Sequence, residues 1–181
     1  MILGNEAIIK AFNSPTGWGF NNASVLEKKQ VQPASVDLRL DSWFTCPVNK
    51  TVWNVREPFV LKPQGFILGR TLESLWLSQF LAAQVSTRSS AMRDGIDVCM
   101  SAGWVDPGYS GKITLEITNH TEVPFILNPL VVNDYGILQY ENQSYCQIKF
   151  FPVMGCTEPY KGKYGGPQQD ESDMISKGVE K

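Results

Sequence analysis

The 181-residue chain is poor in histidine and has no closely spaced pair of cysteines. His120 is its only histidine, and its four cysteines stand far apart, at Cys46, Cys99, Cys146 and Cys156. A zinc site needs three or four thiolate, imidazole or carboxylate ligands, and its cysteines commonly come in short-spaced pairs. The sequence therefore predicts that the protein binds no zinc.

Long apolar stretches and an excess of one charge are missing as well. Sixteen basic and 18 acidic residues give a net charge of −2, which disfavours a broad electrostatic footprint on nucleic acid. Without an apolar run long enough to cross a membrane, a content of 43% hydrophobic and 19% charged residues is typical of a soluble globular protein. The N-terminus shows no secretory pattern, so we expect a cytoplasmic protein.

The length favours a single domain, residues 1–181, with one core. Residues 1–12 carry apolar side chains at helical spacing after Asn5, a plausible N-cap, whereas 13–30 are typical of a loop. From Val36 onward, short alternating stretches predict about a dozen strands and a mainly β fold, a barrel or jelly roll. The clearest are 36–40, 43–48, 59–61, 66–71, 96–100, 112–118, 124–127 and 145–151. The pattern leaves 75–83 undecided between helix and strand.

One polar stretch combines cationic and hydroxyl groups. It reads Arg88-Ser89-Ser90-Ala91-Met92-Arg93-Asp94-Gly95. Guanidinium groups bind phosphate oxygens bidentately, and hydroxyls donate short hydrogen bonds to the same oxygens. The stretch therefore predicts a polyphosphate-binding segment, with a solvated surface loop as the alternative.

Two carboxylates follow. Asp106 opens an Asp-Pro-Gly sequence typical of a tight turn, where it either caps the turn or accepts the 3′-hydroxyl of a sugar. Tyr109 offers a ring to the deoxyribose, although Tyr109 and Trp104 are equally plausible core aromatics. Glu116 shares one face of its predicted strand with Thr114. It is a candidate general base if that face lines a pocket, and a solvent-facing residue otherwise.

The C-terminal residues change in character. Glycines and a polar run beginning at Gln168 cannot bury enough apolar surface to fix their shape alone. We predict that 156–181 form a mobile segment of the same domain that closes over a bound nucleotide, with a frayed terminus as the alternative.

These motifs, with residues 32–40, 66–73, 145–150 and the tail residues 159–168, resemble the dCTP deaminase branch of the dUTPase-like superfamily over nearly the whole chain. The resemblance implies a dUTPase-like distorted β-barrel or jelly roll. It also implies a homotrimer with active sites at the subunit interfaces, and zinc-independent deamination of dCTP. Mg²⁺ would be bound through the nucleotide triphosphate, with no metal held by the protein. The His-x-Glu and Pro-Cys-x-x-Cys pattern of zinc deaminases is absent.

The same resemblance assigns residue roles. It implies that Glu116 exchanges protons with the attacking water and the leaving ammonia, while Ser89 and Arg93 position that water. It implies substrate-binding roles for Arg88 and Ser90 on phosphate, Asp106 on sugar, the backbone of Thr114 and Leu115 on the base, and Gln147, Tyr160, Lys163 and Gln168 elsewhere on the nucleotide.

The leading hypothesis is a dCTP deaminase that produces dUTP and ammonia. One alternative is a bifunctional enzyme that also hydrolyses dUTP to dUMP, because residues 102–106, Ala-Gly-Trp-Val-Asp, resemble that group and Asp106 can activate a water. A plain dUTPase lacks the counterpart of Glu116. Another alternative is a non-catalytic deoxynucleotide-binding regulator, motivated by departures from the family pattern at Met92 and Asp94 and by an insertion near 130–139.

Overall fold

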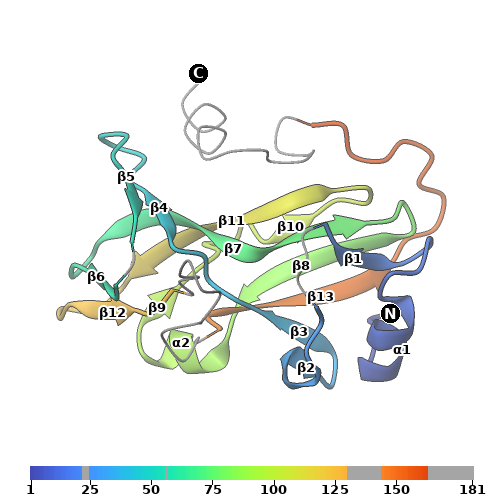
Figure 1. Ribbon diagram of the computed structural model, residues 1–181, viewed down its shortest axis with the longest axis horizontal. Coiled ribbons are helices and arrows are strands. Elements are labelled where there is room, and N and C mark those ends of the chain that lie inside the picture. The colour runs from blue at the N-terminus through green and yellow to red at the C-terminus, as the bar shows by residue number, and fades with distance from the viewer. Residues whose placement is uncertain (22–24, 56, 130–143, 163–181) are drawn as a thin grey trace.

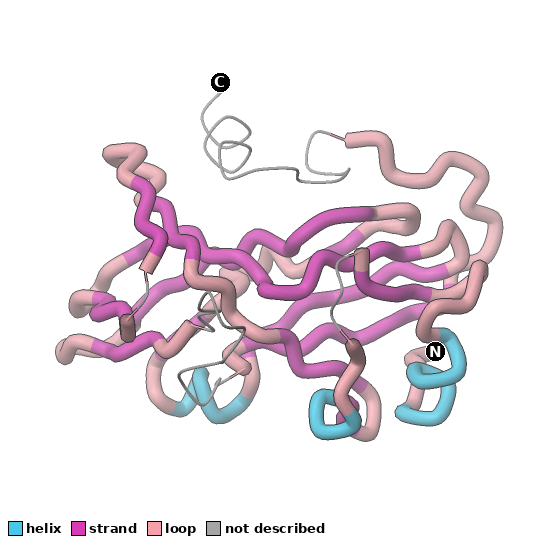
Figure 2. The backbone as a smooth tube through the Cα atoms, viewed as in Figure 1, coloured by secondary structure: helices cyan, strands magenta, loops and turns pink. Residues whose placement is uncertain are grey.

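A computed structural model of the chain describes residues 1–21, 25–55, 57–129 and 144–162. The described chain is mainly β and contains thirteen strands. Its helical elements are short: α1 (Asn5–Ala11), the 3-10 helix η1 (Lys28–Gln30) and α2 (Ser89–Arg93). All three lie along one side of the strand assembly (Figure 2). The prediction of a mainly β fold with a short N-terminal helix is confirmed.

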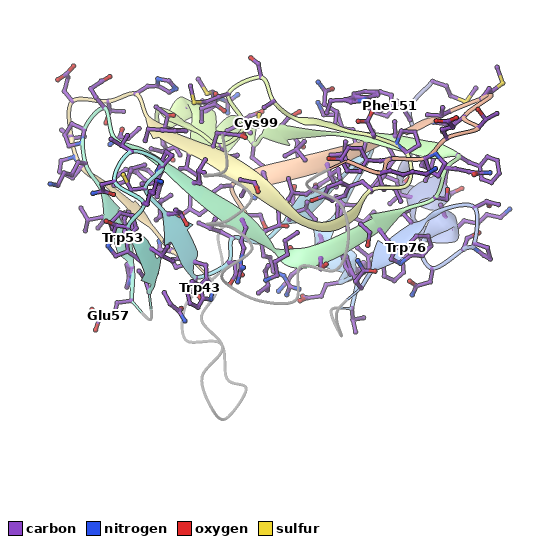
Figure 3. All side chains as sticks on the ribbon, turned by 90° about the horizontal axis from the view of Figure 1, so that it is seen from above. Trp43, Trp53, Glu57, Trp76, Cys99 and Phe151 are labelled. Atoms are coloured by element: carbon purple, nitrogen blue, oxygen red, sulfur yellow. The ribbon has the colours of Figure 1, made fainter. Side chains whose placement is uncertain are left out.

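The larger sheet is antiparallel and has six strands. Its order is β5 (Val52–Asn54), β4 (Trp43–Thr45), β7 (Phe66–Leu77), β11 (Ser110–Asn119) and β9 (Ile96–Asp97), and β1 (Trp18–Phe20) pairs with the end of β7. The central ladder joins β7 to β11 from Ser110 opposite Trp76 to Thr118 opposite Phe66. β7 runs along the length of the molecule (Figure 1), with Trp76 near the C-terminal end of the strand. Trp43 of β4 lies beside the middle of β7, where its ring centroid is 5.6 Å from Arg70 Cζ (Figure 3).

A second antiparallel sheet has five strands, and a third has two. The five-stranded order is β10 (Trp104–Val105), β8 (Leu81–Thr87), β13 (Cys146–Pro152), β3 (Ser35–Leu38) and β2 (Val31–Gln32). The small sheet pairs β6 (Phe59–Leu61) with β12 (Phe125–Leu127).

The core consists of apolar side chains from both large sheets. Leu115 and Ile117 of β11 are buried in the same cluster as Val85 of β8 and Ile148 and Phe150 of β13. Full burial of one such aliphatic or aromatic side chain stabilises the fold by about 1.5–3 kcal/mol. Because the side chains of a strand alternate between faces, burial of Leu115 and Ile117 turns Thr114 and Glu116 to the opposite face. The predicted shared face of Thr114 and Glu116 is confirmed.

Several charged side chains are buried inside this assembly, and Glu73 is the most completely buried of them. Glu73 of β7 is 0% exposed and accepts hydrogen bonds from Arg39 Nε at 2.6 Å, from the Arg39 backbone N–H at 2.9 Å and from Gln30 Nε2 at 3.0 Å. Arg39 also binds Glu27 Oε1 at 3.0 Å, nearer the surface. The donors on Glu73 compensate for its removal from water.

Several local predictions require correction. The helix begins at Asn5 after Gly4 as N-cap, because the Asn5 N–H donates to the Pro33 carbonyl at 2.9 Å. Residues 13–30 are not only a loop, since β1 is fully buried and pairs with the end of β7. The undecided segment 75–83 is extended at both ends, with β7 ending at Leu77 and β8 beginning at Leu81. The strand predicted at 96–100 ends at Asp97.

Candidate functional site

The predicted phosphate-binding stretch is a helix, so its interpretation as an irregular loop is wrong. Arg88 is the N-cap of α2, and Ala91 is the only residue of the helix that is buried. The spacing of α2 therefore turns Ser89, Ser90 and Arg93 outward, where all three are exposed. Gly95 ends the turn with φ at +79°, a left-handed conformation that glycine adopts without steric cost. The hydroxyls and the Arg93 guanidinium are thus available to a ligand.

Arg88 contacts its own chain. Its Nη1 donates to the Ser144 carbonyl at 3.1 Å, and its Nη2 lies 3.4 Å from Asp37 Oδ2. Asp37 is only 6% exposed, and its Oδ1 is buried without a hydrogen-bond partner among the described residues. Burial raises the pKa of Asp37 despite the opposing effects of Arg88 and Gln32. The strand pairing places Gln147 opposite Asp37, but the Gln147 side chain accepts a hydrogen bond from the Ser35 hydroxyl at 3.0 Å, so only Arg88 of the two predicted nucleotide contacts is bound to this carboxylate.

Glu116 lies on β11, opposite Leu68 of β7, and is half-buried. No side chain of the described residues donates a hydrogen bond to its carboxylate or forms an ion pair with it. Burial raises the pKa of Glu116, its own backbone N–H opposes the shift, and the nearby Asp97 adds to it. A carboxyl group with a raised pKa and without a fixed partner is suited to exchanging protons with a ligand.

Asp97 of β9 is a carboxylate that the sequence analysis did not single out. Its side chain accepts hydrogen bonds from the Thr87 hydroxyl and from the backbone N–H groups of Val98, at 2.7 Å, and Cys99, at 3.3 Å. Burial acts to raise the pKa of Asp97, but these donors outweigh it and hold the pKa below the ordinary value. Asp97 is therefore a fixed negative charge on the face that carries Glu116. Only the pairing of β9 with β11, which the sequence does not reveal, places it there.

One edge of β11 remains open in the described chain. β7 pairs with one edge from Ser110 to Thr118, and β9 reaches the other edge only at Thr118 and Asn119. In an antiparallel ladder, alternate residues direct their backbone N–H and C=O groups away from the partner strand. Backbone donors and acceptors around Thr114 and Leu115 therefore have no strand partner on this edge among the described residues. The Leu115 side chain itself is buried in the core.

Asp106 lies at the Asp-Pro-Gly turn, which joins the two large sheets. Its Oδ1 accepts a hydrogen bond from the indole N–H of Trp104 at 3.0 Å, so the Trp104 side chain, which precedes the turn, orients the carboxylate. Trp104 is 58% exposed and is not a core aromatic. Tyr109 is one: it is 9% exposed, and its hydroxyl donates to the Lys112 carbonyl at 2.6 Å. Burial raises the pKa of Tyr109.

The C-terminal segment reaches the same turn. The Tyr160 N–H donates to the Pro107 carbonyl at 2.8 Å, and the Tyr160 ring lies 6.0 Å from that of Tyr109. Tyr160 is thus held against the turn that follows Asp106, and its contact with a nucleotide stays a prediction. Lys163, Gln168 and the insertion near 130–139 lie outside the described residues.

The predicted residues form three groups within one chain: Arg88 with Gln147, Asp106 with Tyr160, and Glu116 with Thr114. Ser89, Ser90 and Arg93 lie on α2, which precedes β9 and is seen next to it (Figure 1). No hydrogen bond or ion pair among the described residues links α2 side chains to Glu116. Asp37 stands within the 32–40 motif and Trp104 within the 102–106 motif, but the sequence does not reveal their partners.

The described residues include no cluster of three or more His, Cys, Asp or Glu side chains that could hold a metal ion. They therefore offer no ready ligand set for a resident metal, and binding of Mg²⁺ through the triphosphate stays a prediction. None of the described helices is long and apolar enough to span a membrane.

Comparison with known proteins gives agreement on family and fold. The family described as dCTP deaminase-like matches residues 2–153. A Coprothermobacter proteolyticus protein named "dCTP deaminase, dUMP-forming" is 37% identical over 170 residues, which cover 83% of this chain and 85% of that protein.

Two solved structures share the fold. The 2′-deoxycytidine 5′-triphosphate deaminase from Agrobacterium tumefaciens superimposes with a TM-score of 0.62 at 23% identity, over 82% of this chain and 48% of that longer chain. The native EIAV dUTPase superimposes with a TM-score of 0.50 at 16% identity, over 80% of this chain and 96% of that one. The predicted dUTPase-like fold is confirmed.

Proposed function

Because the chain belongs to the dCTP deaminase-like family, we propose that it deaminates dCTP and then hydrolyses the triphosphate to release dUMP and pyrophosphate. Its relatives at 34 to 37% identity carry the name "dCTP deaminase, dUMP-forming". This likeness favours the bifunctional alternative over release of dUTP, the product that the sequence analysis placed first.

The observation that carries the deaminase half is the state of Glu116. Its carboxyl group is half-buried, has a raised pKa and faces the same side as the exposed Thr114. The open edge of β11 beside it offers backbone donors and acceptors to the edge of a cytosine. Such a base is held by its polar edge with C4 toward the carboxylate.

In the proposed deamination, Glu116 acts first as a base and then as an acid. The Glu116 carboxylate takes one proton from a water molecule, and the resulting hydroxide forms a bond to C4 of cytosine. The carboxyl group delivers its proton to the exocyclic nitrogen, the C4–N bond breaks and ammonia leaves. The remaining proton of the C4 hydroxyl moves to N3, and the C4 oxygen becomes the uracil carbonyl. Ser89 and Arg93 position the water and stabilise the charge of the intermediate.

Asp106 serves the hydrolytic half. Its carboxylate, oriented by the Trp104 indole, accepts a proton from a second water molecule that attacks the α-phosphorus, and the α–β phosphoanhydride bond breaks. Arg88 and Ser90 hold phosphate oxygens. Mg²⁺ bound to the triphosphate neutralises charge on the leaving pyrophosphate.

We further infer a homotrimer with sites shared between subunits. Among the described residues of one chain, the outward-facing hydroxyls and guanidinium of α2 make no hydrogen bond or ion pair to Glu116, so a neighbouring copy can supply the facing half of a site. A sedimentation or light-scattering mass three times that of the 20.2 kDa chain is expected.

Product analysis tests the function. The purified protein is incubated with dCTP and Mg²⁺, and ammonia, dUTP, dUMP and pyrophosphate are followed over time. We expect ammonia and dUMP in equal amounts, with little free dUTP. Accumulation of dUTP together with ammonia would indicate a deaminase that does not hydrolyse dUTP. Bound but intact dCTP would indicate the regulatory alternative, and either outcome overturns the proposal.

A further inference from the structure

Several hydrogen-bond donors hold the Asp97 carboxylate in place. Besides the three hydrogen bonds to its carboxylate, the Thr87 hydroxyl that donates to it accepts the Val98 N–H at 3.0 Å. Thr87 is the last residue of β8 and directly precedes Arg88. The carboxylate therefore ties β9 to the start of the predicted phosphate-binding stretch, and three donors converge on its Oδ1.

The strand register places this charge next to Glu116. Asp97 pairs directly with Thr118 of β11, and Glu116 stands two residues before Thr118 on the same face. Residues in this diagonal relation have Cα atoms about 7–8 Å apart. The two carboxyl groups are consequently close enough for their charges to interact, without a hydrogen bond between them.

The other groups around Glu116 do not cancel that charge. On β7, Leu68 lies opposite Glu116, and Arg70, opposite Thr114, is already bound to Asp41 at 2.7 Å. Lys112 of β11 binds the same Asp41 oxygen at 2.6 Å. His120 follows β11 and acts on Asp97, whose pKa its charge helps to lower. Thr45 of β4, opposite Leu68, is uncharged. Arg93, in the last turn of α2, forms no ion pair with Asp97 or Glu116 among the described residues.

We propose that Asp97, fixed by Thr87, is a positioning residue for the reaction, keeping a negative charge beside Glu116 and thereby strengthening Glu116 as the base that activates water. This inference rests on the proposed deamination. It adds a residue that touches neither the base nor the attacking water and acts only through Glu116.

The charges of Glu116 and Asp97 determine the direction in which the pH profile of ammonia release should shift. Glu116 must be ionised to take a proton, so ammonia release falls as the pH drops through its pKa. A neighbouring negative charge disfavours ionisation of Glu116, adding to burial, which is the larger cause of its raised pKa. Removing the charge at Asp97 therefore moves the acidic limb of the pH profile to lower pH and weakens the base.

The test compares Asp97→Asn with wild type in kcat/KM for ammonia release from dCTP across the acidic range. Asparagine retains an oxygen for the Thr87 and backbone donors but loses the charge. We expect the acidic limb to move down by about half a pH unit, as for a unit charge at this separation in a half-exposed site, and kcat on the plateau to fall about 2- to 5-fold. Asp97→Glu, which keeps the charge, leaves the limb in place even if it lowers the rate.

Glu122→Gln is the matched control, because Glu122 is an exposed acid just beyond β11. It removes one negative charge from the chain and leaves the limb unchanged. An Asp97→Asn enzyme that is slower with an unmoved acidic limb would overturn the proposal, since a purely structural residue changes the rate and not the titration.

A measurement on the wild-type protein covers the case in which Asp97→Asn does not fold. Carboxyl ¹³C NMR titration of the unmodified protein should show Asp97 ionising at lower pH than Glu116. The reverse order would contradict the proposal. If wild type releases no ammonia from dCTP, the proposed function fails, while the NMR titration still decides whether Asp97 is the charged neighbour of Glu116.

Discussion

Two glutamates on neighbouring strands of one sheet have opposite surroundings. Glu73 of β7 is fully buried and receives three hydrogen bonds, two from Arg39 and one from Gln30. Glu116 of β11 is half-buried, and the described side chains offer its carboxylate no donor, while a second carboxylate, Asp97, stands diagonal to it.

The difference in surroundings distinguishes a carboxylate with a structural role from one suited to proton transfer. A buried charge whose hydrogen-bonding capacity is filled by fixed partners stabilises one arrangement of the chain and has nothing left for a ligand. A carboxylate without partners, in a site that resists its ionisation, is costly to the fold and useful for proton transfer. The comparison therefore indicates a structural role for Glu73 and supports the proposed role of Glu116 in proton transfer.

Replacing Glu73 should have the largest effect on stability. Glu73→Gln leaves the Arg39 guanidinium buried with only its outer partner, and breaking such a pair typically costs about 3–5 kcal/mol. Urea unfolding followed by tryptophan fluorescence measures the loss. An unchanged midpoint would show that the pair is not structural.

Glu27→Gln is the control for that experiment. Glu27 binds the same guanidinium at 3.0 Å, but its side chain is 38% exposed. An exposed ion pair contributes less than about 1 kcal/mol, so this variant should unfold close to wild type. If both variants lose equal stability, burial does not distinguish the two partners of Arg39.

Trp104→Phe tests whether a carboxylate of the proposed site, Asp106, depends on its hydrogen-bond donor. The variant keeps a ring but removes the N–H that donates to Asp106, an exposed hydrogen bond to a charged group. We expect dUMP formation from dUTP to slow about 3- to 10-fold through kcat, with ammonia release from dCTP unchanged. Trp53→Phe, whose indole packs on Phe59, is the matched control. Equal loss of both reactions would place Trp104 in general substrate binding.

Asp37→Asn tests an intermediate case, because one oxygen of Asp37 is paired and the other is buried alone. Burial raises its pKa in the folded chain, so the folded state holds this proton more tightly than the unfolded state. The resulting stabilisation is present below the unfolded pKa and is lost as the pH rises through the folded pKa. In urea unfolding, the stability advantage of wild type over Asp37→Asn should therefore shrink as the pH rises above about 4, the ordinary pKa of aspartate. An advantage that grows over this range would mean that the Arg88 pair dominates.

The sequence predicted what depends on local pattern. Alternation in residues 112–118 was enough to place Thr114 and Glu116 on one face, and strand spacing was enough for a mainly β fold. β1 was missed because Trp18-Gly19-Phe20 is flanked by turn residues, and its extended form depends on pairing with Leu75–Leu77, far along the chain. The five-residue helix α2 was missed because its serines also suit a loop.

The sequence indicated which residues belong to the candidate site, but not which other side chains lie next to them. Glu116, Asp106 and Arg88 were singled out by chemistry or resemblance, but their neighbours Asp97, Trp104 and Asp37 come from strand register or a side-chain hydrogen bond. Such contacts have no period in the sequence, so only the folded chain reveals them. Met92 is exposed on α2, and nothing in the structure explains its difference from the family pattern.

The most direct test of the division between the two glutamates is the Glu116→Gln variant, measured with dCTP and with dUTP. The amide keeps the size of the side chain but cannot take a proton from water. We predict that ammonia release from dCTP falls by about 10²- to 10⁴-fold, while dCTP binding, the urea midpoint and dUMP formation from dUTP remain near wild type. Deamination of dCTP at the wild-type rate would contradict the account.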